Sequence, residues 1–317
     1  MKILFAGTPA NAATTLKYLL ESPFEVVGVL TRPDALVGRK RILTPSSVAQ
    51  VAQDAGIPTI KAVRVDADVQ QQIASLGADV GVVVAYGALL SQQALDLMPM
   101  GWLNLHYSLL PDWRGAAPVQ NALLNGDQQT GVTLFKLDVG LDTGPILGQV
   151  PTLISPGETF GELLGRLTLL GNTLLSEQLP MVAAGLSKPV AQDSQAATRI
   201  AAKPTRKASL INWRQPAQVI ENQIRAFNPE PIAYTTTDTG DLRILQARVA
   251  PDLHNVNGSN PGQLHFEKSR VYAACGAGSW IELLQVQPAG KNQMLAADWA
   301  RGAGSRLIKL GKEEDNG

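Results

Sequence analysis

The chain of 317 residues has little cysteine and little histidine. Its one cysteine, Cys275, cannot form an intramolecular disulfide and cannot build a cysteine-based metal site. The three histidines stand far apart, at positions 106, 254 and 265, which makes a zinc site improbable. We therefore expect a protein without metal in a reducing compartment, the cytoplasm.

Long hydrophobic runs and an excess of one charge are also missing. The apolar run at Lys2–Ala6 is too short for a secretion signal and is followed by Gly7-Thr8-Pro9. No stretch approaches the roughly 18–20 apolar residues of a membrane span, so no membrane partner is expected. Because 27 basic residues balance 27 acidic residues, binding to nucleic acid would have to rely on local patches.

Strand-like apolar runs alternate with helical patterns in the first part of the chain. Strands are expected at Lys2–Ala6, Glu25–Thr31, Asp79–Ala85, Leu103–His106 and Val132–Leu137. Helices are expected near Ala12–Leu20, Ser46–Ala55, Val69–Leu76, Ser91–Leu97, Ala116–Leu124 and Thr159–Leu179. This alternation predicts an α/β domain over residues 1–185, with a Rossmann-like, doubly wound and mostly parallel sheet.

The pattern changes after that domain. Residues 186–204 are rich in Ala, Ser, Pro and Gln and resemble a linker. Residues 205–310 then combine one helix, Ala217–Phe227, with five short strands separated by turn residues, which predicts a small β-barrel of the oligonucleotide-binding (OB) type. The tail at 311–317 is expected to be disordered.

The turn at Phe5-Ala-Gly7 resembles a dinucleotide-binding turn. It lacks the second and third glycines of that fingerprint, and no acidic residue follows cleanly at the end of the next strand. A nicotinamide-dependent dehydrogenase is therefore not favoured.

Three polar residues stand where acyl-transfer chemistry needs them. Asn104 and His106 are two apart on a predicted strand, so they project from one face, and Pro111 and Gly115 mark a loop directly after it. Asp142 lies in a second loop between Gly140 and Gly144. Taken singly, His106 is explained as a half-buried histidine and Asp142 as a turn residue. Their occurrence together beside two such loops favours a catalytic site.

The motifs Asn104-Leu-His-Tyr-Ser-Leu-Leu-Pro-Asp-Trp-Arg-Gly115 and Asp138-Val-Gly-Leu-Asp-Thr-Gly144 resemble the signature of the formyltransferases that use 10-formyltetrahydrofolate. The resemblance extends from Phe5 to Lys291 and is most specific for the branch that acts on methionyl-tRNA. It implies that a formyl group passes from 10-formyltetrahydrofolate to the α-amino group of methionine on initiator tRNA. It also places the family's catalytic residues on Asn104, His106 and Asp142.

The resemblance implies a role for each of these residues. Asn104 and a protonated His106 would donate hydrogen bonds to the oxyanion, and Asp142 would raise the pKa of His106 and orient its ring. The folate would bind along the turn after the third predicted strand and along the two loops. The residues implied there are Ala85, Tyr86, Gly87, Leu89, Ser108, Leu109, Leu110, Pro111, Val139 and Gly140.

Basic residues are the implied contacts to tRNA. Arg39, Lys40 and Arg41 match a family loop that inserts into the acceptor stem, although a run of three charges is also typical of a solvated loop. Lys203, Arg206, Lys207 and Lys291 are the further candidates in the second domain. We expect the protein to act as a monomer.

The sequence departs from the family pattern at five positions. Ala35, Ser47 and Ala49 flank the basic loop where relatives often carry Arg, Pro and Lys. Asn11 replaces a common phenylalanine, and Tyr107 replaces a small residue.

Three other functions stay open. One is a formyltransferase acting on an amino sugar nucleotide, one is a formyltetrahydrofolate hydrolase, and one is an RNA-binding protein without activity. The basic loop favours tRNA over the first two, and the intact polar triad argues against the third.

Overall fold

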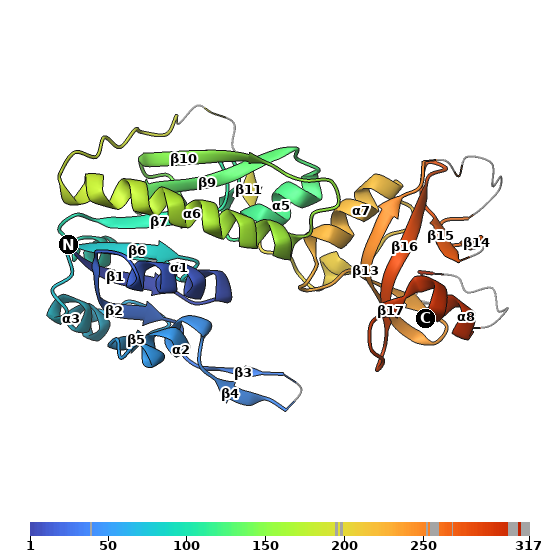
Figure 1. The fold of residues 1–317 in the computed structure, drawn as a ribbon, viewed down its shortest axis with the longest axis horizontal. Helices are drawn as coiled ribbons and strands as arrows, with labels where there is room; N and C mark the ends of the chain where they lie inside the picture. The colour runs from blue at the N-terminus through green and yellow to red at the C-terminus, as the bar shows by residue number, and fades with distance from the viewer. Residues whose placement is uncertain are drawn as a thin grey trace. The chain divides into compact units, whose positions relative to one another are not determined.

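The computed structural model describes residues 1–38, 40–193, 196, 199–251, 253, 260–267, 269–303 and 310–311. The chain forms two compact units (Figure 1). The first unit consists of Met1–Pro118, Gln129–Leu153 and Leu164–Ala202, and the second of Val119–Gln128, Ile154–Leu163 and Lys203–Gly317. Both units are therefore assembled from separate stretches of the sequence.

The first unit is built on a seven-stranded sheet in the order β10-β9-β7-β6-β1-β2-β5. Its strands are β1 (Lys2–Gly7), β2 (Glu25–Thr31), β5 (Thr59–Lys61), β6 (Val80–Val84), β7 (Trp102–His106), β9 (Gln129–Lys136) and β10 (Ile146–Leu153). The five neighbouring strands β7, β6, β1, β2 and β5 pair in parallel. Strand β9 pairs antiparallel with both β7 and β10. Strands buried on both faces explain the continuous apolar runs of β1 and β6.

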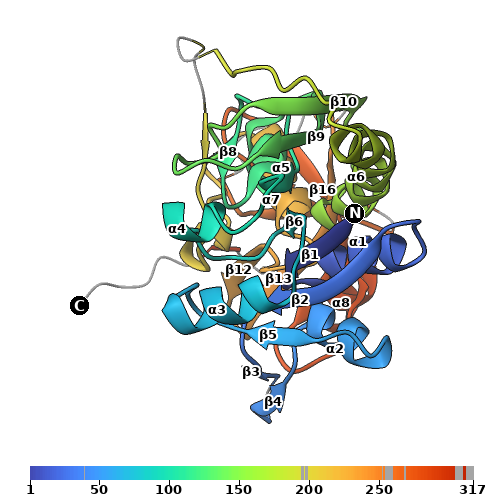
Figure 2. The same cartoon turned by 90° about the vertical axis from the view of Figure 1, so that its left-hand side faces the viewer.

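Helices cover both faces of this sheet. They are α1 (Ala10–Leu20), α2 (Ser47–Asp54), α3 (Ala67–Ser75), α4 (Gln92–Leu95) and the long α6 (Phe160–Ala183). Figure 2 shows α1 and α6 on one face and α3 and α4 on the other. Ser46, Asp66 and Ser91 cap α2, α3 and α4, because each side chain accepts a backbone N–H of the first turn. The predicted α/β class and mostly parallel sheet are confirmed.

Two short elements inside predicted loops were not foreseen. Strands β3 (Ala35–Val37) and β4 (Ile42–Thr44) form a hairpin around the basic residues, and β8 (Arg114–Gly115) pairs in parallel with β11 (Ile200–Ala201). The hairpin buries none of its residues, so it lacks the hydrophobic alternation by which strands are recognised.

Helix α5 (Pro118–Asn125) belongs to the second unit from Val119 onward and starts two residues later than predicted. The backbone N–H groups of Ala116 and Ala117 both donate to the carbonyl of Ala201. Those residues are thereby held outside the helix, and Pro118 suits the first helical position.

The second unit contains an antiparallel sheet in the order β12-β13-β16-β15-β14, with β17 also paired to β16. Its elements are η1 (Lys207–Ser209), α7 (Ala217–Ala226), β12 (Tyr234–Thr237), β13 (Gly240–Val249), β14 (Leu264–Glu267), β15 (Arg270–Ala274), β16 (Trp280–Pro288), β17 (Met294–Leu295) and α8 (Ala296–Ala303). The sheet is curled into half a barrel, in agreement with the predicted class. The predicted tail lies outside the described residues except for Gly311.

Cys275 follows β15 and is 4% exposed. Burial raises the pKa of its thiol to about 12, so the reactive thiolate is scarce at mildly alkaline pH. We expect iodoacetamide to leave the folded protein unmodified by mass spectrometry and to alkylate it once after denaturation. Equal rates in the two states would contradict this burial.

No helix among the described residues is both long enough and apolar enough to cross a membrane.

Candidate active site

Strand β7 positions the first two residues of the predicted triad. Asn104 lies opposite Phe135 on β9, and His106 lies opposite Thr133. The two residues project from one face of β7 because they are two apart. His106 is 6% exposed, and its ring stands edge to face against Phe135 with the centroids 6.3 Å apart. Among the described residues, none forms a hydrogen bond with the half-buried side chain of Asn104.

The ring orientation of His106 is fixed by a backbone carbonyl. Its Nε2 lies 2.9 Å from the carbonyl oxygen of Trp113. A carbonyl can only accept, so Nε2 carries a hydrogen. In the neutral ring, Nδ1 is then the atom that can accept a proton.

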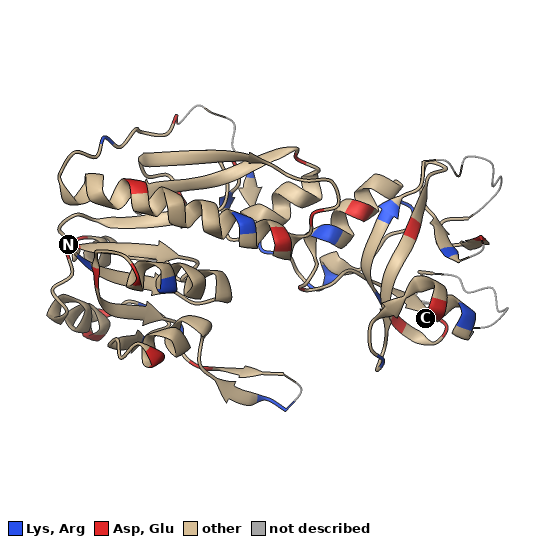
Figure 3. Ribbon diagram, in the orientation of Figure 1, with Lys and Arg blue, Asp and Glu red and all other residues tan. Residues whose placement is uncertain are grey.

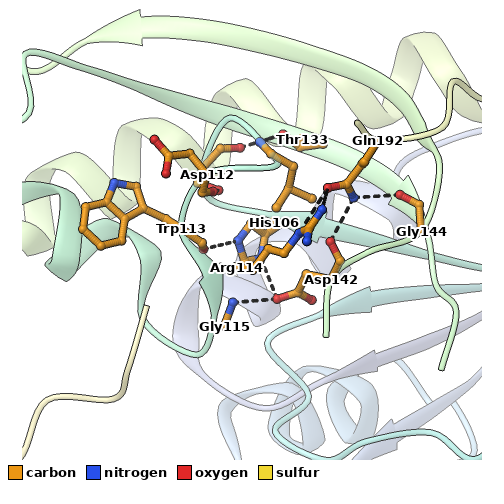
Figure 4. A network of polar contacts seen from close by, with 11 residues as sticks. His106, Asp112, Trp113, Arg114, Gly115, Thr133, Asp142, Gly144 and Gln192 are labelled. Atoms are coloured by element: carbon orange, nitrogen blue, oxygen red, sulfur yellow. Dashed lines mark hydrogen bonds and ion pairs between the residues drawn. The ribbon is translucent and has the colours of Figure 1, made fainter. Parts of the chain in front are cut away.

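Asp142 reaches His106 from a loop that folds back across the sheet. Strand β9 ends beside the start of β7, where Lys136 pairs with Leu103. The loop after β9 therefore begins at the end of β7 that lies away from His106. Asp142 has a positive φ of 53° in this loop. Its Oδ2 accepts the backbone N–H of Gly115 at 2.7 Å and lies 3.9 Å from Nδ1 of His106 (Figure 4). The structure thus brings the three predicted catalytic residues into one region.

Two opposing effects act on the pKa of His106. Burial lowers the pKa of His106 more than the carboxylate of Asp142 and the carbonyl of Trp113 raise it. These effects together hold the pKa of His106 below its ordinary value of 6.5, which favours the neutral ring. Asp142 acts in the expected direction, whereas desolvation opposes the protonated form in which the resemblance has His106 donate to the oxyanion.

Gln192 connects the loops around this pair and was not predicted from the sequence. Its Nε2 donates to the carbonyls of Asp142 and Gly144 at 2.9 and 2.8 Å. Its Oε1 accepts from Nη2 of Arg114 at 2.6 Å and from Nε of the same side chain at 3.2 Å. Figure 4 shows this glutamine between Arg114 and the loop of Asp142. A single amide in a stretch rich in Ala, Ser and Gln gives no local signal of such a role.

The loop after His106 is anchored by side chains of β9 and β10. Thr133 Oγ1 donates to the carbonyl of Ser108 at 2.6 Å and accepts the N–H of Leu110 at 3.1 Å. Gln149 donates to the carbonyl of Leu110 at 2.9 Å. These bonds hold the loop, whose Leu110–Pro111 peptide is cis.

The residues implied to bind folate fall into two groups. The side chains of Tyr86, Ser108 and Leu110 are buried, and the hydroxyls of Tyr86 and Ser108 donate to the carbonyls of Ala62 and Asp112. These three side chains are therefore part of the packing, and only their backbone remains for a ligand. Leu109 and Pro111 are half-buried, whereas Ala85, Gly87, Leu89, Val139 and Gly140 are exposed.

The basic residues implied to contact tRNA are at the surface where the structure describes them. Arg39 lies outside the described residues. Lys40 and Arg41 are exposed in the turn of the β3–β4 hairpin, where Figure 3 shows basic residues. Lys203, Arg206, Lys207 and Lys291 are exposed residues of the second unit.

Two of the departures from the family pattern contact each other. The amide of Asn11 donates to the hydroxyl of Tyr107 at 3.0 Å. Tyr107 is 6% exposed, and burial raises the pKa of its hydroxyl. Asn11 on α1 therefore provides a hydrogen-bond partner for the buried hydroxyl of Tyr107.

Within the part of the chain that the structure describes, no group of three or more His, Cys, Asp or Glu side chains is placed to hold a metal ion.

Comparisons with known proteins cover nearly the whole chain. The formyl transferase family matches residues 1–179, and the formyl transferase C-terminal domain matches residues 203–304. The methionyl-tRNA formyltransferase of Renibacterium salmoninarum is 46% identical over 304 residues, covering 96% of this chain and 97% of that protein. That of Acidothermus cellulolyticus is 44% identical over 317 residues, covering 96% and 97%.

Solved structures share the fold at much lower identity. A sugar 3N-formyl transferase superposes with a TM-score of 0.64 at 19% identity, covering 92% of this chain and 99% of that one. HypX from Aquifex aeolicus in complex with tetrahydrofolic acid gives 0.62 at 14% identity, covering 96% and 47%. These identities support the fold alone, whereas the sequence matches are far closer. The chain therefore belongs to the formyl transferase family, and within it to the methionyl-tRNA formyltransferases.

Proposed function

We propose that this protein transfers the formyl group of 10-formyltetrahydrofolate to the α-amino group of methionine on initiator tRNA. The observation that carries the proposal is a buried His106 whose Nδ1 lies 3.9 Å from the carboxylate of Asp142, two residues after Asn104 on β7. The names of the relatives supply the acceptor, methionyl-tRNA.

His106 serves as the proton carrier. The attacking amine must lose a proton as the carbon–nitrogen bond forms, and Nδ1 of the neutral ring accepts it. The imidazolium that results is stabilised by Asp142, and it returns the proton to the folate nitrogen as the bond from that nitrogen to the formyl carbon breaks. The lowered pKa of His106 favours the second transfer, because the ring readily gives up the proton again.

Asn104 stabilises the oxyanion of the tetrahedral intermediate. Its amide N–H groups have no partner among the described residues and project from the same face as His106. A preorganised donor at such a position is worth about 2.7–4 kcal/mol.

The exposed loops around the triad fit a flat, partly apolar co-substrate. Leu89 is 84% exposed after β6, and Val139 is 71% exposed beside Asp142. Apolar side chains exposed on loops beside a catalytic site are a common feature of ligand pockets. We propose that the backbone of Ala85–Gly87 and Gly140 orients the pterin ring while these side chains cover it.

The test is transfer of labelled formyl from 10-formyltetrahydrofolate to charged tRNA. Purified protein is given methionine-charged initiator tRNA, with charged elongator tRNA and a reaction without acceptor as controls. We expect transfer to the initiator. Transfer of the formyl group only to water would make the protein a formyltetrahydrofolate hydrolase. Transfer only to an amino sugar nucleotide would make it a different formyltransferase.

The basic residues support tRNA as the acceptor. Lys40 and Arg41 lie on an exposed hairpin. Arg206 and Arg243 line a cleft of about 400 Å³ together with Tyr234 and two acidic residues, Glu230 and Asp241. Guanidinium groups beside an aromatic ring suit a nucleotide backbone and base. We propose that the hairpin, with Arg39, contacts the acceptor stem and that Lys203, Lys207 and Lys291 extend the basic surface of the second unit.

Removing Lys40 and Arg41 together should weaken tRNA binding. We expect the variant with both residues changed to alanine to raise KM for tRNA and to reduce the slope of log KM against log salt by about 2, since each phosphate contact contributes about 1. The KM for folate should stay constant. The matched control removes two exposed lysines elsewhere, Lys17 and Lys188. An unchanged salt slope would remove the hairpin from the proposal.

All three residues of the triad come from one unit of one chain, which supports action as a monomer. We propose the cytoplasm as the place of action, because charged initiator tRNA is used there.

A further inference from the structure

Most of the predicted linker, up to Ala202, belongs to the first unit. We use the name strap for its described residues 190–193, 196 and 199–201. Val190 exchanges two backbone hydrogen bonds of 2.8 Å with Ile146 on β10. At its other end, Ile200–Ala201 pairs in parallel with Arg114–Gly115. Composition predicted a linker here, but the strap lies along the loops that surround His106.

Gln192 holds the loop that carries Asp142. Two of its hydrogen bonds end on the carbonyls of residues 142 and 144, one on each side of Thr143. Asp142 has the left-handed conformation that non-glycine residues seldom adopt, so this loop needs external contacts to keep its shape. Because Arg114 fixes the other end of the amide, the donor groups of Gln192 can face only the loop.

Arg199 holds the turn that carries the carbonyl bound by His106. Its guanidinium donates to both carboxylate oxygens of Asp112, with Nε at 3.0 Å from Oδ1. The same group lies over the ring of Trp113, 4.2 Å from the centroid. Arg199 also lowers the pKa of Asp112, so this carboxylate stays charged. Trp113, whose carbonyl accepts from His106 Nε2, is thereby held through its side chain.

We propose that Gln192 and Arg199 are positioning residues for formyl transfer, because the strap holds the two backbone segments that supply both polar partners of His106. Gln192 acts through Asp142, and Arg199 acts through Trp113. The kinetic part of this inference rests on the proposed function, whereas the effect on His106 itself does not.

The test compares Gln192→Ala with Asp142→Asn and with the double variant. Loss of Gln192 frees the loop, so Asp142 no longer raises the pKa of His106. We expect kcat to fall about 30-fold in Gln192→Ala, with KM for tRNA unchanged. In the Asp142→Asn background the same change should hardly lower kcat further, because the carboxylate through which Gln192 acts is already absent.

A titration of the imidazole resonances by NMR gives a readout independent of activity. The chain has only three histidines, so the signal of His106 is identified by its loss in His106→Asn. The pKa of His106 should fall in Gln192→Ala, as in Asp142→Asn, and the double variant should match Asp142→Asn. Gln192→Glu should also lower the pKa of His106, since a carboxylate keeps the contact with Arg114 but cannot donate to the two carbonyls.

Gln223 offers a matched control. Its amide also donates to two backbone carbonyls, those of Ala208 and Leu210, but it lies on α7 in the second unit. Gln223→Ala should leave the pKa of His106 and kcat unchanged. Equal behaviour of the two glutamine variants, or additive losses in the double variant, would overturn the positioning role. Absence of formyl transfer by the wild type, with the titration as expected, would instead count against the proposed function alone.

For Arg199, the variant Arg199→Lys keeps the charge and loses the two-pronged contact with Asp112. We expect kcat to fall by the same factor in the wild type and in the Asp142→Asn background, since Arg199 acts through Trp113 and not through Asp142. No fall in either background would remove Arg199 from the proposal.

Discussion

Replacing His106 with alanine is expected to lower kcat for formyl transfer by about 10³- to 10⁴-fold. General acid–base catalysis by a positioned side chain contributes about 10²–10⁴-fold, and here one ring serves two proton transfers. The residual rate would come from Asn104 and from substrate binding. The KM for tRNA should change little, because His106 is buried beneath the loops.

The measurement is a single-turnover assay with 10-formyltetrahydrofolate and methionine-charged initiator tRNA. His265→Ala is the control, because this histidine lies on β14 of the second unit. The wild type should lose kcat/KM as pH falls through the pKa of His106, below the ordinary value of 6.5. Wild-type kcat in His106→Ala would refute the proton-carrier role.

Changing Asp142 to asparagine should have the second largest effect. The change removes the negative charge 3.9 Å from Nδ1, so the imidazolium formed during attack loses its counter-charge. Unit charges about 4 Å apart interact by about 4 kcal/mol at an effective dielectric constant of 20. Solvent and neighbouring dipoles offset part of this energy, so we expect kcat to fall by about 10²- to 10³-fold.

The pH profile of Asp142→Asn separates this role from a purely structural one. The carboxylate raises the pKa of His106, and its removal lowers that pKa further. Activity depends on the neutral ring, so the acid limb of kcat/KM should move to lower pH. The asparagine can still accept the N–H of Gly115 through its side-chain oxygen, which keeps the loop in place. An acid limb that stays in place or moves upward would contradict the electrostatic role.

Much of the fold could be predicted because local pattern and burial agree. The apolar runs of β1, β2 and β6 are buried in the sheet, and their ends differ from the predicted ends by about one residue. The β3–β4 hairpin could not be seen, because its residues are exposed and carry no alternation.

The placement of the candidate site residues was predictable where the spacing within one strand sets the geometry. Asn104 and His106 follow from β7, and Asp142 follows from a loop with a recognisable motif. Gln192 bonds to residues 48, 50 and 78 positions away, a distance over which no periodicity extends. The lowering of the pKa of His106 by burial could not be predicted, because this burial results from packing against Phe135 and the loop of Trp113.

The pairing of β8 with β11 has a consequence for folding of the chain during its synthesis on the ribosome. Chains emerge at about 5–20 residues per second, and upstream domains begin to fold before synthesis ends. The seven strands of the first sheet are complete once Leu153 has emerged. Arg114–Gly115, however, gains its partner only after Ala201 has been made. A nascent chain that stops at residue 185 can therefore contain the whole sheet and the triad, yet it still lacks Gln192 and Arg199, the residues that we propose position the two polar partners of His106.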